Sequence, residues 1–197
     1  MANKKKLLIV GSSQGHYGGI EAFMIAMANE SQNWEEFDVR LCFKIVEGAQ
    51  LHDGLVSTAK KMCDHVYFVK RNSPELRTQI AWADILHVQN TPPDIIFPAK
   101  LQGKKLYLTV HNWRRTNLSV HNILWGLAVK LADRVWYNSK FVWDTWEPGK
   151  KSARSACVPT VCNLPKFVNT VPVADRKGFI FIGRWIANKG LEELLAA

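Results

Sequence analysis

Three short segments carry residues that suit the binding of a phosphorylated ligand. The first is GSSQGHYGG, residues 11–19, which follows an apolar run at residues 7–10. Its glycines match neither the GxGxxG nor the GxxxxGK[ST] spacing. Glycine still permits close backbone approach, and the start of the helix that follows offers N–H groups to an anion. The loop is therefore either a phosphate cradle or an ordinary strand-to-helix turn with glycines for tight packing.

The second segment is a polar pair at the end of an apolar strand pattern. His111 and Asn112 close the segment 105–112. Ligands bind at the carboxyl ends of strands in open parallel sheets, and a histidine there can donate a hydrogen bond or carry a proton near neutral pH. The alternative is that His111 only caps its strand.

The third segment is a basic loop near the carboxyl end of the sequence. Arg184 and Lys189 flank a predicted strand-to-helix connection. An arginine clamps a phosphate with two donors, and a lysine adds a point charge. An exposed basic loop without a ligand has the same composition, so both interpretations stay open.

The elements that must position these residues form an alternating pattern. Helix-like stretches separate most of the strand-like segments, and Ser73 and Pro74 have the residue types of an N-cap and a first helical position. This order predicts an α/β protein, a Rossmann-like parallel sheet with helices on both faces. The strand-like segments are 6–12, 37–46, 64–71, 84–90, 105–112 and 132–139.

The pattern changes after residue 150. We predict an N-terminal Rossmann-like domain over residues 1–165, with a short strand within 156–162, and a linker over 166–177. A new strand at 179–182 and a helix then open a second domain over 178–197. One βα unit cannot bury its own faces. We therefore expect the chain to be a truncated form of a two-domain protein.

The amino-acid composition of the chain limits the classes of molecule that it could bind. The chain has 197 residues, a net charge of +9 and eight tryptophans. Such a charge suits nucleic acid, an anionic membrane surface or a phosphorylated ligand, and it also suits solubility alone. The four cysteines show no metal-ligand spacing, so we expect reduced thiols, a cytoplasmic location and no bound metal. No apolar run reaches the length of a transmembrane helix.

Taken in order, the motifs resemble family 4 (group 1) of the retaining glycosyltransferases, which have the GT-B fold of two Rossmann-like domains. The matching portion is the N-terminal domain and the start of the C-terminal domain. The matching residues are Gly18, Gly19, Ile20 and Glu21, then His111 and Asn112, then Ala132, Asp133, Val135 and Ser139, and finally Phe181, Gly183, Arg184, Lys189, Gly190, Leu194 and Ala197.

The resemblance implies roles for these residues. Arg184 and Lys189, with Gly18 and Gly19, correspond to the binding site for the donor diphosphate, and His111 corresponds to the catalytic residue beside the donor sugar. The implied reaction transfers a sugar from a nucleotide diphosphate sugar to a glycan or lipid-linked acceptor of cell-envelope polysaccharide synthesis, with retention and without a cofactor or metal. The residues implied for the acceptor side of the cleft are His16, Glu21, Asn112 and Ser139.

Two departures from the family pattern limit this resemblance. The family often has NGVD before the linker, whereas this chain has VCNLPKF, where only Asn163 corresponds. The larger part of the second domain, which supplies most of the nucleotide site in the family, has no counterpart in the sequence. We therefore expect little or no transferase activity from the chain alone.

A membrane contact is a further hypothesis. Trp113, Arg114 and Arg115 precede an apolar stretch that contains Trp125, and basic residues beside tryptophan suit an anionic membrane interface. We expect peripheral attachment at the inner face of the membrane through residues 113–131, with a core-packing helix as the alternative. A different class of function is a basic, non-catalytic fragment that binds an acceptor, a membrane surface or nucleic acid. No nucleic-acid module is recognisable, so we expect no nucleic-acid partner.

Overall fold

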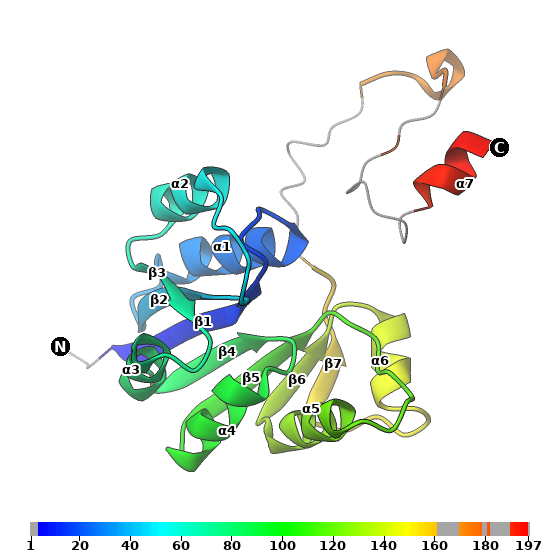
Figure 1. Ribbon diagram of the computed structural model, residues 1–197. Helices are drawn as coiled ribbons and strands as arrows, with labels where there is room; N and C mark the ends of the chain where they lie inside the picture. Colours follow the sequence, from blue (N-terminus) through cyan, green and yellow to red (C-terminus); the bar gives the residue numbers. More distant parts are fainter. Residues whose placement is uncertain (1–3, 161–169, 179–180, 182–189, 197) are drawn as a thin grey trace. The chain divides into compact units, whose positions relative to one another are not determined.

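A seven-stranded, fully parallel sheet forms the centre of the first part of the chain (Figure 1). The computed structural model describes residues 4–160, 170–178, 181 and 190–196. The strand order is β3-β2-β1-β4-β5-β6-β7. This confirms the predicted Rossmann-like α/β sheet. The strands are β1 (Lys5–Ser13), β2 (Phe37–Ile45), β3 (Val66–Lys70), β4 (Ile85–Gln89), β5 (Lys105–Val110), β6 (Arg134–Tyr137) and β7 (Ser155–Cys157).

The strand order decides which face each helix covers. The chain runs outward from β1 to β3, returns to β4 beside β1, and then continues to β7. Because crossovers between parallel strands are right-handed, this reversal places helices on both faces of the sheet. Helices α1 and α2 pack on one face, and α3, α4, α5 and α6 pack on the other. The helices are α1 (Gly19–Ser31), α2 (Asp53–Met62), α3 (Pro74–Trp82), α4 (Pro93–Leu101), α5 (Val120–Leu131) and α6 (Lys140–Trp146).

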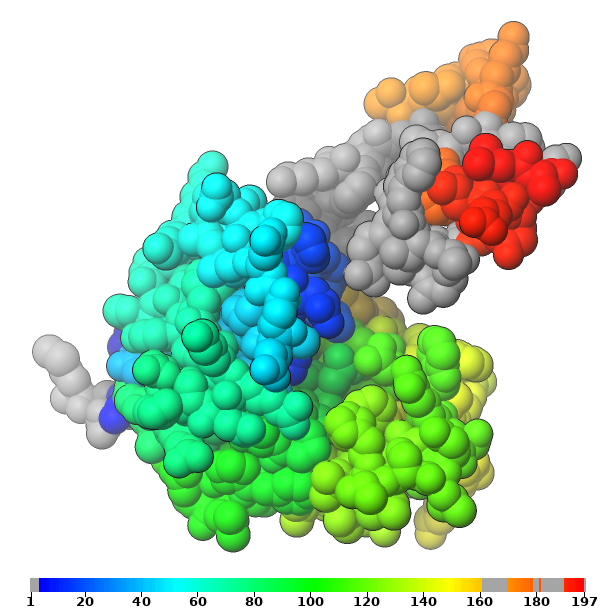
Figure 2. Space-filling view, viewed as in Figure 1, coloured from blue at the N-terminus to red at the C-terminus, as the bar shows by residue number. Residues whose placement is uncertain are grey.

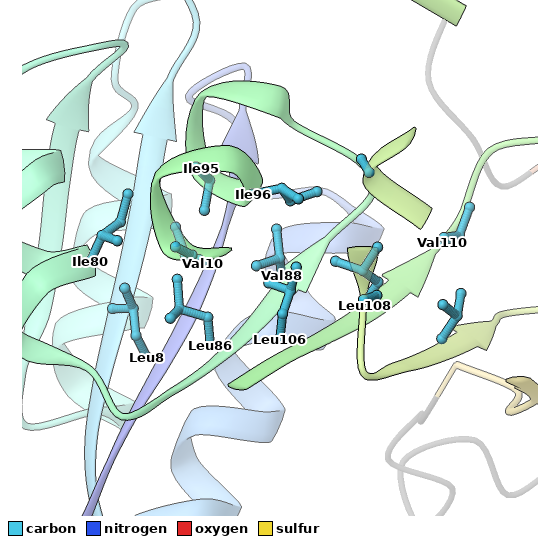
Figure 3. Packing of buried hydrophobic residues seen from close by; sticks show 14 of the residues in the cluster. Leu8, Val10, Ile80, Leu86, Val88, Ile95, Ile96, Leu106, Leu108 and Val110 are labelled. Carbon is cyan, nitrogen blue, oxygen red and sulfur yellow. The ribbon is translucent and has the colours of Figure 1, made fainter. Parts of the chain in front are cut away.

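Two hydrophobic clusters lie on the two faces of the sheet. The larger one joins β1, β4 and β5 to α3 and α4, and Figure 3 shows its side chains converging from these elements. The smaller one joins β1 and β2 to α1 and α2. Each fully buried Leu or Ile contributes about 1.5–3 kcal/mol through burial of apolar surface. The clusters therefore fix the strands, and with them the loops that leave their carboxyl ends.

Local signals set the helix starts. Ser73, Ser119 and Ser139 are N-caps whose hydroxyl oxygens accept hydrogen bonds from the backbone N–H three residues later. The predicted cap at Ser73, followed by Pro74, is confirmed. Each such cap contributes about 1 kcal/mol. The short strand predicted within 156–162 corresponds to β7, which begins at Ser155 and has three residues.

The chain divides into two compact units, 1–162 and 163–197. In the second unit the structure describes a 3-10 turn, η2 (Val173–Asp175), and a short helix, α7 (Leu191–Ala196). Most of the predicted strand at 179–182 lies outside the described residues, as does the loop that carries Arg184 and Lys189. The domain boundaries proposed from the sequence stay predictions.

The three described cysteines of the first unit are free thiols. Cys42 and Cys63 are buried, and Cys157 is half-buried. Burial raises the pKa of Cys42 to about 12 and that of Cys63 to about 11, so both stay protonated at neutral pH. Cys162 lies outside the described residues. In the part of the chain that the structure describes, no helix has the length and apolar character needed to cross a membrane.

Candidate ligand-binding crevice at the carboxyl edge of the sheet

A crevice opens where the chain direction across the sheet reverses. Connections from β1 and β4 leave in opposite directions, which is the topological switch point where ligands bind in open α/β sheets. A pocket of about 290 Å³ lies there, and Figure 2 shows the cyan segment after β2 and the lime-green segment of α5 on its two sides. Its lining comes from Ser12, Lys44, Ile45, Val46, Glu47, Arg71, Asn90, Thr91, Pro92, Pro93, Asp94, Val110, Asn112, His121, Trp125 and Trp146.

A buried ion pair forms part of the crevice lining. The Lys44 Nζ atom donates to both carboxylate oxygens of Asp94, at 2.6 and 2.9 Å, and the two side chains are only 7% and 8% exposed. Burial lowers the pKa of Lys44, while the bond to Asp94 opposes that shift. The Nε atom of Arg71 lies 3.9 Å from Oδ2 of Asp94. A buried ion pair contributes little net stability compared with apolar side chains of the same size, so stability alone does not explain its presence. Because this pair lines a crevice, Lys44 and Asp94 are candidate ligand-binding residues.

Aromatic side chains supply a second part of the lining. Trp125 of α5 is half-buried, with its ring 4.7 Å from that of His121. Trp146 closes α6, and its Nε1 atom donates to the carbonyl oxygen of Asn112 at 2.8 Å. The charged lining residues are two cations and two carboxylates. The crevice therefore combines indole surface with polar groups whose formal charges balance, which suits a neutral polar ligand.

His111 belongs to a polar cluster on the α1 side of the same sheet edge. Its Nε2 atom lies 2.9 Å from Oε1 of Gln89, and its ring meets the edge of Phe23 at 5.6 Å. On the neighbouring strand, Nε2 of His87 lies 2.7 Å from the Thr109 hydroxyl. Burial lowers the pKa of His111 to about 4, and burial with a contribution from His111 lowers that of His87 to about 3. Both imidazoles are neutral at pH 7 and can serve as hydrogen-bonding groups.

Backbone and amide groups hold His111 in place. The backbone N–H of His111 donates to Oδ1 of Asn90, and Asn90 itself adopts a left-handed φ of 58°. Asparagine is one of the few residues that tolerate this conformation. The Nε2 atom of Gln89 is buried and has no hydrogen-bond partner among the described residues. The Oε1 atom of this amide is thus engaged with His111, while its buried Nε2 atom is unpaired among the described residues.

The glycine loop is shaped by two glycines that the motif comparison did not single out. A Cβ on Gly11 would lie 2.9 Å from both Cβ of Gln89 and Sδ of Met24. Gly15 has a φ of +83°, and a Cβ there would lie only 2.0 Å from the Gln50 carbonyl oxygen. By contrast, Gly18 is the N-cap of α1, and a Cβ on Gly19 would meet no described atom within 4 Å. Tight packing explains why glycine stands at positions 11 and 15. At Gly19 there is no such packing, so a ligand has room to approach.

The structure separates the residues expected on the acceptor side. Asn112 lines the crevice. His16 is exposed and its ring lies 4.0 Å from that of His52, whereas Glu21 is buried in the first turn of α1. Ser139 uses its hydroxyl to cap α6. Of these four residues, only Asn112 lines the pocket at the switch point.

The four residues expected at a membrane also fall in different places. Trp113 is 59% exposed and Arg115 is exposed. The Arg114 guanidinium lies 5.9 Å from the Trp146 ring and faces a second pocket beside α5. Trp125 packs against the core cluster and lines the crevice.

Several site residues escaped the sequence argument. Lys44 lies inside an apolar strand pattern, CFKIV, and a lysine among buried strand residues was the available signal. Asp94, Gln89 and Trp146 carry no comparable signal, because their roles depend on which strands and helices become neighbours. Within the described residues, no group of three or more His, Cys, Asp and Glu side chains is arranged to hold a metal ion.

Comparisons with known proteins reveal likeness at the level of structure. No family model and no curated protein matches the sequence. A crystal structure of UDP-N-acetylglucosamine 2-epimerase aligns with a TM-score of 0.56 and 12% identity, covering 79% of this chain and 48% of the epimerase. The Neisseria meningitidis UDP-GlcNAc 2-epimerase, solved bound to UDP-GlcNAc, aligns with a TM-score of 0.56 and 15% identity over 77% of this chain and 45% of that one.

A transferase aligns in the same way. A UDP-glucosyltransferase from Polygonum tinctorium has a TM-score of 0.52 and 14% identity, covering 88% of this chain and 56% of that one. The chain thus spans about half the length of these solved structures. At such low identity the likeness shows the fold alone, which is a Rossmann-like α/β fold with a parallel sheet.

Proposed function

We propose that this chain carries the acceptor-side domain of an enzyme that transfers a sugar, with retention, from a nucleotide diphosphate sugar to a glycan or lipid-linked acceptor. The observation that supports this most directly is the crevice at the switch point, with its indole surface and its balanced charges. Tryptophan offers a broad apolar face, and the Lys44–Asp94 pair with Asn112 offers donors and acceptors for hydroxyl groups. The family assignment suggested by the motifs is part of this proposal.

His111 is the residue we assign to the reacting sugar. A neutral imidazole beside the crevice edge can exchange a hydrogen bond with a sugar hydroxyl. Its ring is held through Nε2 by Gln89 and its backbone through Asn90. The roles of Arg184 and Lys189 on the donor diphosphate rest on the motif resemblance, and these two residues stay predictions.

A binding experiment tests the acceptor role without requiring turnover. The 197-residue chain is titrated with a panel of neutral oligosaccharides while tryptophan fluorescence and saturation-transfer NMR are recorded. We expect the affinity for one of these oligosaccharides to fall about tenfold in Trp125→Leu, because loss of an aromatic contact of about 1–1.5 kcal/mol corresponds to that factor. Trp113→Leu, which changes an exposed tryptophan outside the crevice, serves as the matched control. No binding by any neutral oligosaccharide, or equal loss in both variants, contradicts the acceptor role.

An activity assay separates the enzyme classes that share this fold. The chain is incubated with UDP-glucose or UDP-GlcNAc, with and without oligosaccharide, and products are followed by NMR. We expect neither transfer nor epimerisation above background, because the charges of the crevice lining balance and the residues assigned to the donor diphosphate belong to the second unit. Robust transfer by the chain would overturn this expectation, and epimerisation of UDP-GlcNAc would overturn the transferase proposal.

The outer face of α5 supports a second part of the proposal, which is contact with an anionic membrane. Four apolar residues recur along this helix with spacings of three or four and remain exposed, and Leu118 just before it is 98% exposed. Arg114 and Arg115 precede them, and Arg134 follows. An apolar helix face flanked by cations matches an anionic membrane interface. The four residues are Val120, Ile123, Leu127 and Leu131.

Vesicle sedimentation tests this contact. We expect the chain to sediment with phosphatidylglycerol vesicles at low salt and to be released at high salt, since surface charges are screened. Ile123→Ser combined with Leu127→Ser should abolish sedimentation. Leu101→Ser, which changes an 88% exposed leucine at the end of α4, is the control. Undiminished sedimentation of the double variant would exclude α5 as the contact.

A further inference from the structure

A second pocket borders the carboxyl half of α5 and carries a strong positive charge. It has a volume of about 440 Å³ and lies between α5, α6 and the segment that leads into β7. Five of its lining side chains are cations and one is a carboxylate. The cations are Arg114, Lys130, Lys150, Lys151 and Arg154, and the carboxylate is Glu147. We call this site the basic pocket.

The single carboxylate of the basic pocket does not pair with these cations. Glu147 accepts hydrogen bonds from neutral donors, which include the Tyr137 hydroxyl at 3.1 Å and Nε1 of Trp143 at 3.2 Å. The backbone N–H of Ser152 and the Ser155 hydroxyl each donate to Oε2 of Glu147 at 2.8 Å. Partial burial raises the pKa of Glu147, but these four donors outweigh it and hold the pKa below its usual range. Its charge is thus occupied in fixing the α6–β7 connection.

The cations are largely uncompensated. Lys151 forms an ion pair with Asp144 at 2.5 Å. Among the described residues, no carboxylate lies within 4.0 Å of the charged nitrogen atoms of Arg114, Lys130, Lys150 or Arg154. Cations gathered around a concave, low-dielectric surface focus a positive potential. The basic pocket therefore has a charge that a bound anion would neutralise.

The carboxyl end of α5 lies at the same place, and Arg154 offsets part of its effect on an anion. Helix carbonyl groups carry partial negative charge that repels an anion. Here the Arg154 guanidinium donates to the carbonyl oxygens of Lys130, at 3.2 Å, and Ala132, at 2.5 Å. These bonds cover the helix end and also fix the guanidinium, which keeps other N–H groups for a ligand. Arg154 is thus a pre-organised cation.

We propose that the basic pocket binds a phosphate-bearing anion, either a phosphate ester in solution or the phosphate of a lipid headgroup. The proposal is independent of sugar transfer at the crevice. Phosphate suits the pocket because arginine binds its oxygens with two parallel donors, while Lys130 and Lys150 add charge without a fixed geometry. The neutral ligand proposed for the crevice would gain nothing from this charge.

Titration calorimetry of the full chain with inorganic pyrophosphate tests the proposal. Lys130→Gln combined with Lys150→Gln should weaken binding about tenfold, because loss of two partly screened charge contacts of about 0.7 kcal/mol each corresponds to that factor. The control is Lys60→Gln combined with Lys61→Gln in the last turn of α2, which removes the same charge elsewhere. We expect this control to change the affinity less than about twofold. Circular dichroism establishes that both variants fold.

A second arm identifies the source of the phosphate. Vesicles containing phosphatidic acid are sedimented with the chain in the presence and absence of pyrophosphate. Competition between the two ligands supports a headgroup site, and pyrophosphate binding without vesicle binding supports a soluble ester. Absence of pyrophosphate binding in the parent chain, or equal weakening in the two lysine variants, overturns the proposal.

Discussion

The crevice and the basic pocket both border α5, but their charged groups are compensated in different ways. In the crevice, Lys44 and Asp94 neutralise each other within a buried pair. In the basic pocket, five cations surround one carboxylate that neutral donors already satisfy. The overall charge of +9 does not reveal this difference. The pairing of charged side chains within each site, rather than the net charge of the chain, indicates which ligand that site accepts.

The two sites also differ in what their charged groups do for the fold. Breaking a buried pair leaves an unpaired charge that burial penalises, whereas an exposed lysine interacts mainly with water. We therefore expect a change to the Lys44–Asp94 pair to affect stability, and changes to the exposed lysines of the basic pocket to affect ligand binding. Four predictions test this division, from the largest expected effect to the smallest.

The largest effect is expected from Lys44→Met. This change leaves Asp94 buried without its bidentate partner, and the free energy of unfolding should fall by about 3–5 kcal/mol. Urea denaturation measures the loss. Lys150→Met, at an exposed position of the basic pocket, should change the free energy of unfolding by less than about 0.5 kcal/mol.

A double variant separates the loss of a pair from the loss of a packed side chain. Lys44→Met combined with Asp94→Leu removes both charges, so a large part of the stability should return. If the double variant were no more stable than Lys44→Met, lost packing rather than an unpaired carboxylate would explain the effect.

The second prediction uses pH, because the buried His87 and the half-buried His111 are both neutral at pH 7. The pKa of His87 is about 3 in the folded chain and about 6.5 in the unfolded chain. Below pH 6.5 the unfolded state binds a proton that the folded state does not, so stability is full above that pH and falls as the pH drops toward 3. At about pH 5, His87 should cost about 2 kcal/mol, and His111 acts in the same direction.

Urea denaturation at about pH 7.5 and about pH 5.0 measures this loss. His87→Gln keeps a donor for Thr109 but does not titrate, so its loss on acidification should be smaller by about 2 kcal/mol. His65→Gln at an exposed position is the control. Equal losses in the parent and in His87→Gln would show that His87 does not govern the acid sensitivity.

Much of the fold could be predicted from the sequence, because its signals are local. The apolar segments ending near Val10 and Val110, and the Ser73–Pro74 helix start, depend only on nearby residues. Their alternation also predicts a parallel sheet, and helices on both faces follow from right-handed crossovers. These features need no knowledge of which strands become neighbours.

The sites were less accessible to prediction, because they depend on long-range neighbours. Lys44 and Asp94 are fifty positions apart and meet because β2 and α4 adjoin the switch point. Gln89 reaches His111 because β4 and β5 are adjacent. Likewise, Arg114 and Arg154 line one pocket only after α5 and α6 have packed. Motif order pointed to the carboxyl edge of the sheet, but it did not provide these partners.

The third prediction concerns Glu147→Gln in the basic pocket. An amide cannot accept all four hydrogen bonds, so the free energy of unfolding should fall by about 1–3 kcal/mol. Loss of the carboxylate also raises the positive potential, so pyrophosphate should bind more tightly. Thermal denaturation and calorimetry measure the two effects. Glu35→Gln, an exposed change of the same charge, should alter neither; tighter binding in both variants would indicate a general charge effect.

The smallest effect is expected from Gly19→Ala in the glycine loop, the other segment with features of a phosphate site. Gly19 begins α1 and has open space around it, so alanine should raise the free energy of unfolding by no more than about 0.5 kcal/mol. Pyrophosphate affinity should stay within about twofold of the parent chain, because the proposed site lies beside α5 and not at this loop. Gly15→Ala, whose Cβ would collide with Gln50, should instead be strongly destabilising. A large loss of pyrophosphate binding in Gly19→Ala, with stability unchanged, would move the phosphate site from the basic pocket to the glycine loop.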